Sequence, residues 1–77
     1  MSSLKIKISA DERSSFTVMF EPSGMSYDLS GSEFMFAEFN GIDANELEVI
    51  YWDGGMSFWP PGPVVTFDSE GIELHRL

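Results

Sequence analysis

The stretch LEVIYWDGGMSFW at residues 47–59 gives the clearest view of the fold of this chain. Residues 47–52 are rich in β-branched and aromatic side chains, which are typical of strands. Asp-Gly-Gly follows at positions 53–55, and such pairs are the residues that tight hairpin turns require. Residues 56–59 then return as a second strand. The sequence therefore predicts a β-hairpin at this place.

Period-2 alternation of apolar and polar residues continues over the rest of the chain. Turn residues separate the further predicted strands, which cover residues 4–8, 16–20, 25–29, 33–40, 64–67 and 72–77. Residues 33–40 (EFMFAEFN) are apolar on both faces, as expected of a central strand. Asp43 and Glu46 have the spacing of a capping box, so a single helical turn is expected near residues 42–47.

Short strands with regularly spaced turn signals are typical of sandwiches and small barrels. We expect an all-β fold, either a small antiparallel sandwich or a partly open barrel of about six to eight short strands. At 77 residues, the chain is expected to form one acidic β domain over residues 1–77. The proline-rich stretch at residues 60–63 formally matches a P-x-x-P recognition pattern, but a stiff crossover or edge protection is the favoured interpretation.

Charge is the most unusual property of the sequence. It has 13 acidic residues against four basic ones, a formal net charge of −9. All the acids except Asp11 and Glu12 lie between Ser14 and His75, a stretch without Lys or Arg. Such a chain cannot neutralise its carboxylates locally, so most must face water and repel one another. Direct binding to nucleic acid or to an anionic membrane is not expected, because both require cationic surfaces.

The sequence also limits the setting in which the chain works. It has no cysteine, which excludes disulfides and thiolate metal sites. No apolar run approaches the ~18–20 residues that span a bilayer. Residues 1–7 lack the apolar core of a signal peptide. A soluble, cytoplasmic protein, monomeric or homodimeric, is therefore the expectation.

No arrangement of residues in the sequence points to catalysis. His75 is the only histidine, and a strand-surface imidazole is expected there rather than a catalytic base. Paired carboxylates perform acid–base catalysis only inside a cleft, and a chain this short leaves little room for one. The acidic turns at residues 53–55 and 68–71 do not match the spacing of a calcium loop. We expect no enzyme activity, no catalytic residue, no metal site and no cofactor.

The acidic residues are instead candidates for binding a partner. Carboxylates about 7 Å apart on one strand face lie within the ~10 Å Debye length at 0.1 M salt and reinforce one another. Such an array resembles the repeated charge of a nucleic-acid backbone and suits a basic protein surface. The predicted partner-binding residues are the densest acidic stretch with one aromatic anchor: Glu33, Glu38, Asp43, Glu46, Glu48, Trp52 and Asp53.

Aromatic residues on both sides of the predicted hairpin turn offer a second kind of surface. Tyr51, Trp52, Phe58 and Trp59 lie there, and side chains on opposite faces of a hairpin cannot all be buried against a single core. Exposed aromatic rings rimmed by acids have the composition of an interface. The alternative is that the fold covers both faces of the hairpin.

The general profile, a very short, acidic, cysteine-free chain without catalytic groups, resembles that of small protein inhibitors. Examples are phage-encoded anti-defence proteins, including anti-CRISPR proteins, and immunity proteins that neutralise nuclease toxins. The resemblance lies in the profile and not in a motif. It implies a stoichiometric inhibitor, a DNA mimic that presents negative charge to a basic, nucleic-acid-binding partner. The alternatives are a β scaffold module that uses residues 51–59, with charge serving solubility only, and adaptation to salt.

Overall fold

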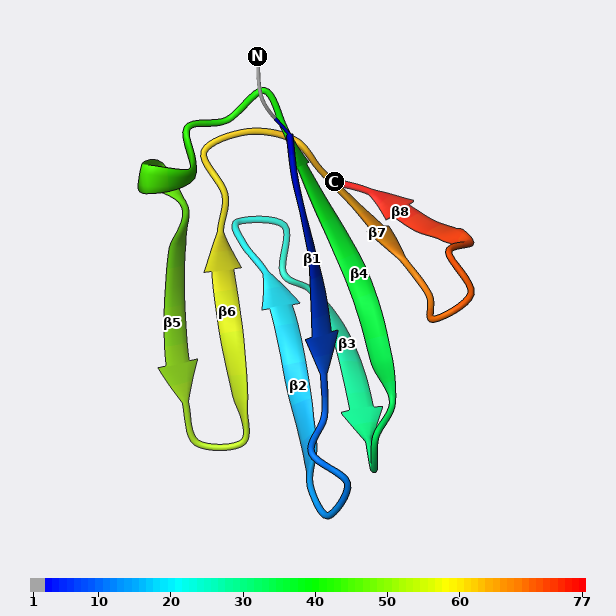
Figure 1. Cartoon of the computed structure of the whole chain (residues 1–77). Helices are drawn as coiled ribbons and strands as arrows, with labels where there is room; N and C mark the ends of the chain where they lie inside the picture. Colours follow the sequence, from blue (N-terminus) through cyan, green and yellow to red (C-terminus); the bar gives the residue numbers. More distant parts are fainter. Residues whose placement is uncertain (1–2) are drawn as a thin grey trace.

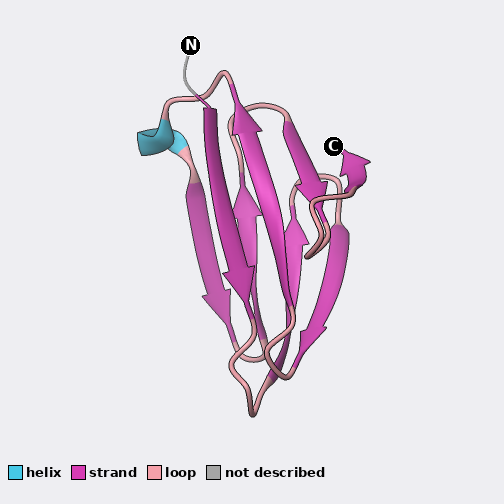
Figure 2. Cartoon of the chain, turned by 45° about the vertical axis from the view of Figure 1, so that its right-hand side comes forward, coloured by secondary structure: helices cyan, strands magenta, loops and turns pink. Residues whose placement is uncertain are grey.

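Two four-stranded β-sheets make up the computed structural model, which describes residues 3–77 (Figure 1). Met1 and Ser2 lie outside the described residues. They belong to the domain predicted over residues 1–77 and to residues 1–7, which lack the apolar core of a signal peptide. The strands in chain order are β1 (Ser3–Ser9), β2 (Ser15–Phe20), β3 (Met25–Ser30), β4 (Phe34–Asn40), β5 (Glu48–Trp52), β6 (Gly55–Trp59), β7 (Val64–Phe67) and β8 (Glu73–Arg76). A 3-10 helical turn, η1 (Ala44–Glu46), precedes β5. The predicted all-β class is confirmed, and Figure 2 shows the strands lying side by side in the two layers.

The first sheet has the order β1-β4-β7-β8 and the second has the order β3-β2-β6-β5. Neighbouring strands are antiparallel except for β2 and β6, which run parallel. This pair departs from the expected purely antiparallel arrangement because the chain leaves the second sheet after β3 and re-enters it at β5. The helical turn expected near residues 42–47 is confirmed, and the Asp43 carboxylate caps it by accepting a bond from the Asn45 amide at 3.0 Å.

The core lies between the sheets and is dominated by aromatic rings. Phe20, Phe39 and Phe58 are buried at its centre, with the Phe20 and Phe58 rings stacked at a centroid distance of 5.4 Å. Phe39 comes from β4, which pairs with both β1 and β7. The prediction that this segment is a central strand is therefore confirmed.

The outer face of β4 explains why this strand is apolar on both sides. The Lys7 ammonium lies 4.1 Å from the centroid of the Phe34 ring, and the Lys5 ammonium lies 5.4 Å from that of Phe36. Both lysines belong to β1, and their aliphatic stems shield the rings from water. Arg76 of β8 also lies in this first sheet. The strands of the second sheet carry no Lys or Arg.

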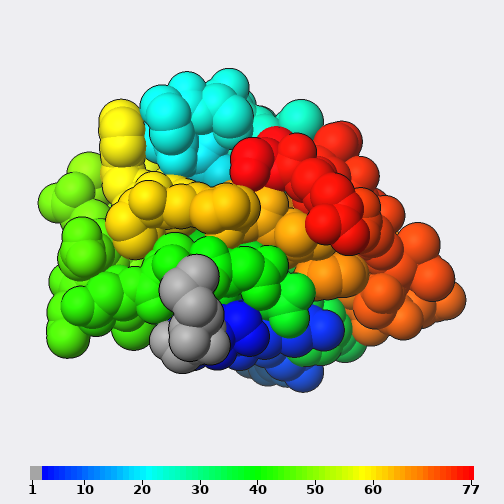
Figure 3. Space-filling model, turned by 90° about the horizontal axis from the view of Figure 1, so that it is seen from above, coloured from blue at the N-terminus to red at the C-terminus, as the bar shows by residue number. Residues whose placement is uncertain are grey.

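The proline-rich stretch crosses from one sheet to the other. Residues 60–63 join β6 of the second sheet to β7 of the first. Seen from above in Figure 3, they run between the β2–β3 turn and the loop that follows β4. The Asn40 amide donates to the Pro63 carbonyl at 3.3 Å, which ties the crossover to the end of β4. The predicted crossover between the sheets is confirmed.

Candidate functional site

The β5–β6 hairpin is the part of the molecule with the most exposed apolar side chains. Its turn is formed by Asp53 and Gly54, and Gly54 has a φ of +91°, a conformation that side chains disfavour. Trp52 pairs with Gly55 at the turn, and the register continues to Glu48 opposite Trp59. The hairpin predicted from the sequence is therefore present.

One face of β5 points in the direction of the core but is not covered by it. Val49 pairs with the buried Phe58, and Tyr51 pairs with Met56, which packs against the core. Val49 is nevertheless 49% exposed and Tyr51 is 80% exposed. The reason is the offset of the two sheets: β5 is the outermost strand of the second sheet and extends past β1, the edge of the first (Figure 1). The inward face of β5 therefore meets water.

The opposite face of the hairpin carries Ile50 and Trp59, which are 43% and 42% exposed. Trp52 lies on this face too, but its ring covers Gly55 and its indole N–H donates to the Ser57 hydroxyl at 2.9 Å. Phe58 is buried in the core. The expectation that some of the hairpin aromatics are exposed is thus met by Tyr51 and Trp59, whereas the predicted anchor Trp52 is partly occupied in holding the hairpin together.

A hollow of about 390 Å³ lies beside the uncovered face of β5. It is lined by Phe16, Tyr51, Met56 and the glycines of the hairpin turn, together with serines that include Ser9 at the end of β1. The hollow lies where the first sheet stops short of β5. Its lining is both apolar and hydroxyl-bearing.

The structure divides the predicted acidic residues into groups. Asp43, Glu46 and Glu48 lie together where η1 leads into β5, and Asp53 lies at the other end of the same strand. Glu33 belongs to the β3–β4 turn, where its carboxylate accepts the Ser30 amide at 2.7 Å. Glu38 lies on β4 directly opposite Lys5, on the outer face of the first sheet. Four of the six predicted acids therefore flank β5, and Glu33 and Glu38 lie away from it.

Comparisons with protein families, with curated proteins and with solved structures gave no match to this chain.

A second cluster, which the sequence did not predict, joins the two sheets at their other side. The Tyr27 hydroxyl of β3 lies 2.7 Å from the Thr66 hydroxyl of β7 and 2.8 Å from His75 Nδ1 of β8. Thr66 is fully buried, and its hydroxyl also accepts the His75 amide at 3.2 Å. Burial raises the pKa of Tyr27 above its ordinary value of 10.0, and the Thr66 hydrogen bond opposes this in part. The cluster fixes the relative position of β3 and β8, and no sequence pattern marks it because its members are far apart along the chain.

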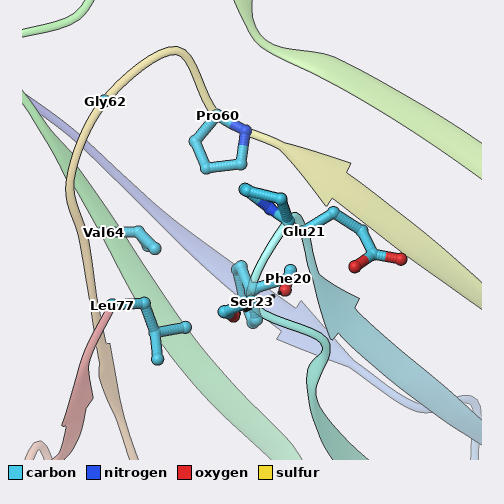
Figure 4. Close-up of a pocket in the computed structure, with 8 residues that line it drawn as sticks. Phe20, Glu21, Ser23, Pro60, Gly62, Val64 and Leu77 are labelled. Atoms are coloured by element: carbon cyan, nitrogen blue, oxygen red, sulfur yellow. Dashed lines mark hydrogen bonds between the residues drawn. The ribbon is translucent and has the colours of Figure 1, made fainter.

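One smaller concave site is too small for an ordinary ligand. It is a cavity of about 70 Å³ at the end of the sandwich, where Phe20, Pro60 and Leu77 approach one another (Figure 4). Small-molecule pockets usually enclose about 300–1,000 Å³. Within residues 3–77 no group of three or more His, Asp or Glu side chains is placed to hold a metal ion. The same residues include no helix with the length and hydropathy needed to cross a bilayer.

Proposed function

We propose that this chain is a non-enzymatic binding protein that docks on a basic protein surface through its β5–β6 hairpin. The observation that carries the proposal is the combination of exposed apolar side chains on β5 with carboxylates at both ends of the same strand. Interfaces have an apolar centre and a polar rim, which is the arrangement found here. Lys5 and Lys7 of the first sheet lie over the rings of Phe67 and Phe34, on the outer face of that sheet.

The finer form of the proposal is that binding inhibits a nucleic-acid-binding partner in the cytoplasm. A surface lined by Lys and Arg to hold phosphates also attracts a fixed set of carboxylates. Occupying such a surface with one copy of this chain would block nucleic acid from it. The acids that serve this purpose are Asp43, Glu46, Glu48 and Asp53, whereas Glu33 and Glu38 contribute only through the net charge.

The grouping of the acids supplies a matched test. The chain is immobilised and exposed to a lysate of its native host, and bound protein is eluted with a salt gradient. Glu46→Gln/Glu48→Gln should lose the captured protein, because it removes charge beside β5. Glu33→Gln/Glu38→Gln changes the net charge equally but lies elsewhere, so it should retain that protein. Equal behaviour of the two double variants, or elution that is insensitive to salt, would count against charge-directed binding.

The inhibitory form requires a further result. The captured protein should bind labelled DNA or RNA by itself, and the chain should displace that nucleic acid at a one-to-one ratio. A ternary complex would show binding without inhibition.

A scaffold module is the second candidate, and the exposure of Tyr51 and Trp59 favours it. In that case the aromatic rings supply the affinity and the carboxylates serve solubility. Tyr51→Ala or Trp59→Ala should then abolish capture, while the Glu46→Gln/Glu48→Gln variant should leave it unchanged. The two candidates therefore predict opposite results for the Glu46→Gln/Glu48→Gln variant.

A further inference from the structure

The free edge of β5 differs from the other three sheet edges of this sandwich. Native proteins protect exposed edges with lysines, bulges, short strands or charged side chains, because an open edge pairs with other chains. The β1 edge carries Lys5 and Lys7, and the β8 edge is four residues long with a register shift and an ion pair between Arg76 and Glu73 at 2.8 Å. The β3 edge carries Asp28, which accepts a bond from Thr17 at 2.7 Å.

β5 has none of these devices along its middle. Its central residues are Val49, Ile50 and Tyr51, all of them apolar or aromatic and all exposed. Among the strands of residues 3–77 it pairs only with β6. An unprotected apolar edge strand in a soluble protein is a place where another strand can add.

The backbone of β5 also presents the groups that strand addition uses. Trp52 and Gly55 flank a two-residue turn, so their backbone groups point at each other across the hairpin. By alternation, the N–H and C=O groups of Val49 and Tyr51 point away from β6, along the free edge. The same two residues carry the uncovered side chains of the inward face. A strand added here would therefore gain hydrogen bonds and apolar contacts from the same residues.

The charge around this edge determines what kind of strand fits it. Asp43, Glu46 and Glu48 lie at the start of β5 and Asp53 at its end, about 17 Å from Glu48 at the usual rise per residue. A second copy of the chain would bring the same carboxylates and a further charge of −9 to this edge. A strand with an apolar centre and Lys or Arg at both ends would instead place opposite charges together.

We infer that β5 is a strand-addition site, whose occupant is an extended segment of a basic partner protein with an apolar centre and cationic ends. This inference rests on the proposed function, since it states how the basic partner would dock. Backbone hydrogen bonds to Val49 and Tyr51 supply the geometry, and the flanking carboxylates select the charge.

The test uses defined peptides and the full chain. The probe is acetyl-Lys-Val-Thr-Val-Thr-Lys-amide, with two controls: the same peptide with Glu at both ends, and the Lys peptide with methylated backbone nitrogens. Amide NMR shifts of the isotope-labelled chain are followed during titration to millimolar peptide. The Lys peptide should shift the Val49 and Tyr51 amides in a saturable manner and slow their hydrogen exchange. The methylated peptide, which has the same charge but lacks donors, should bind at least tenfold more weakly.

A pair of variants separates backbone pairing from side-chain contact. Tyr51→Pro removes an edge N–H that makes no bond to β6, whereas Tyr51→Thr keeps that N–H and removes the ring. Binding should be lost in the first and weakened only in part in the second. Should Tyr51→Pro unfold the chain, the methylated peptide makes the same comparison with the unaltered protein.

The outcomes also separate this inference from the proposed function. If the Lys and methylated peptides bind equally and salt weakens both, strand addition is wrong while charge-directed binding stands. If the Glu peptide binds as well as the Lys peptide, strand addition stands and charge selection fails. Val49 and Tyr51 shifts that follow protein concentration without any peptide would show that a second copy is the occupant, which overturns the inference of a basic partner. Unchanged Val49 and Tyr51 amides with every peptide would overturn strand addition itself.

Discussion

Gly55→Ala is expected to destabilise the hairpin on which the candidate site is built. Gly55 lies in β6 between Trp52 of β5 and Thr17 of β2, and it pairs with both. A Cβ at this position would meet the Thr17 carbonyl oxygen and the Trp52 ring, with Trp52 Cζ2 only 2.7 Å away. The methyl group of alanine therefore cannot be accommodated without movement of one neighbour.

The size of the effect follows from which neighbour moves. Ordinary contact begins at 3.4 Å, so the Trp52 ring must shift by at least about 0.7 Å (3.4 − 2.7), while the Thr17 carbonyl is backbone and cannot rotate away. Overpacking of this kind costs about 1–3 kcal/mol. Loss of the Trp52–Ser57 hydrogen bond adds about 0.5–1.5 kcal/mol, and the lower unfolded-state entropy of alanine returns about 0.4–1 kcal/mol. The net loss is about 0.5–4 kcal/mol, from a total near 4–12 kcal/mol for a chain of this length.

Urea denaturation measures this loss directly. With a slope near 1 kcal/mol per molar urea, the midpoint should fall by about 0.5–4 M. In a Trp59→Phe background Trp52 is the sole tryptophan, and its emission should shift to the red as its ring leaves Ser57. Gly24→Ala is the control, since Gly24 has a φ of +78° and nothing within 4 Å of a Cβ; it should lower the midpoint through backbone strain alone, with no change in emission. An unchanged midpoint and emission in Gly55→Ala would refute the close approach of β2, β6 and the Trp52 ring.

Three further predictions concern the core, the inter-sheet cluster and the charge. Phe39→Ala should cost about 3–5 kcal/mol by calorimetry or urea, because this fully buried ring leaves a cavity. Above about pH 10 stability should fall, because the raised pKa of Tyr27 lets the unfolded chain release that proton first; below that pH both states are protonated and the contribution is constant. Tyr27→Phe should remove this part of the alkaline loss in denaturation midpoints measured from pH 8 to 11. Raising NaCl from about 20 to 500 mM should raise the urea midpoint by screening repulsion at a net charge of −9, and Glu46→Gln/Glu48→Gln should reduce the increase.

Much of the fold could be predicted because its signals are local. Alternation at residues 4–8 and 16–20, the Asp-Gly turn at positions 53–54 and the capping pattern at Asp43 each act within a few residues. The parallel pairing of β2 with β6 could not be predicted from either strand's sequence. It depends on where the chain re-enters the second sheet after forming β4 in the first. The same holds for the Tyr27–Thr66–His75 cluster, whose members meet only after both sheets form.

In the candidate site, some acidic residues that are close in the sequence are also close in space, and others are not. Glu46 and Glu48 remain neighbours because only Leu47 separates them. Glu38 lies in β4 of the first sheet, and the loop after β4 carries the chain to the second sheet, so Glu38 lies away from β5. The strand at residues 47–52 was predicted, but the exposure of Val49 and Ile50 was not. Their exposure comes from the offset between the sheets, a tertiary property that residue types do not encode. A usable signal was present nonetheless, since four consecutive apolar or aromatic residues in one short strand cannot all point at a single core.

The acidic charge and the open edge of β5 explain each other better than either does alone. An apolar edge without lysine, proline or bulge would normally invite pairing with a second copy. In this chain such pairing would bring two sets of carboxylates at Asp43, Glu46, Glu48 and Asp53 within about a Debye length, ~10 Å at 0.1 M salt, so repulsion opposes it. On the strand-addition proposal the same carboxylates attract a cationic strand, so that resistance to self-pairing and selection of a partner become two effects of one charge distribution. Glu33 and Glu38 share in the first effect through the net charge, but only the acids flanking β5 can produce the second.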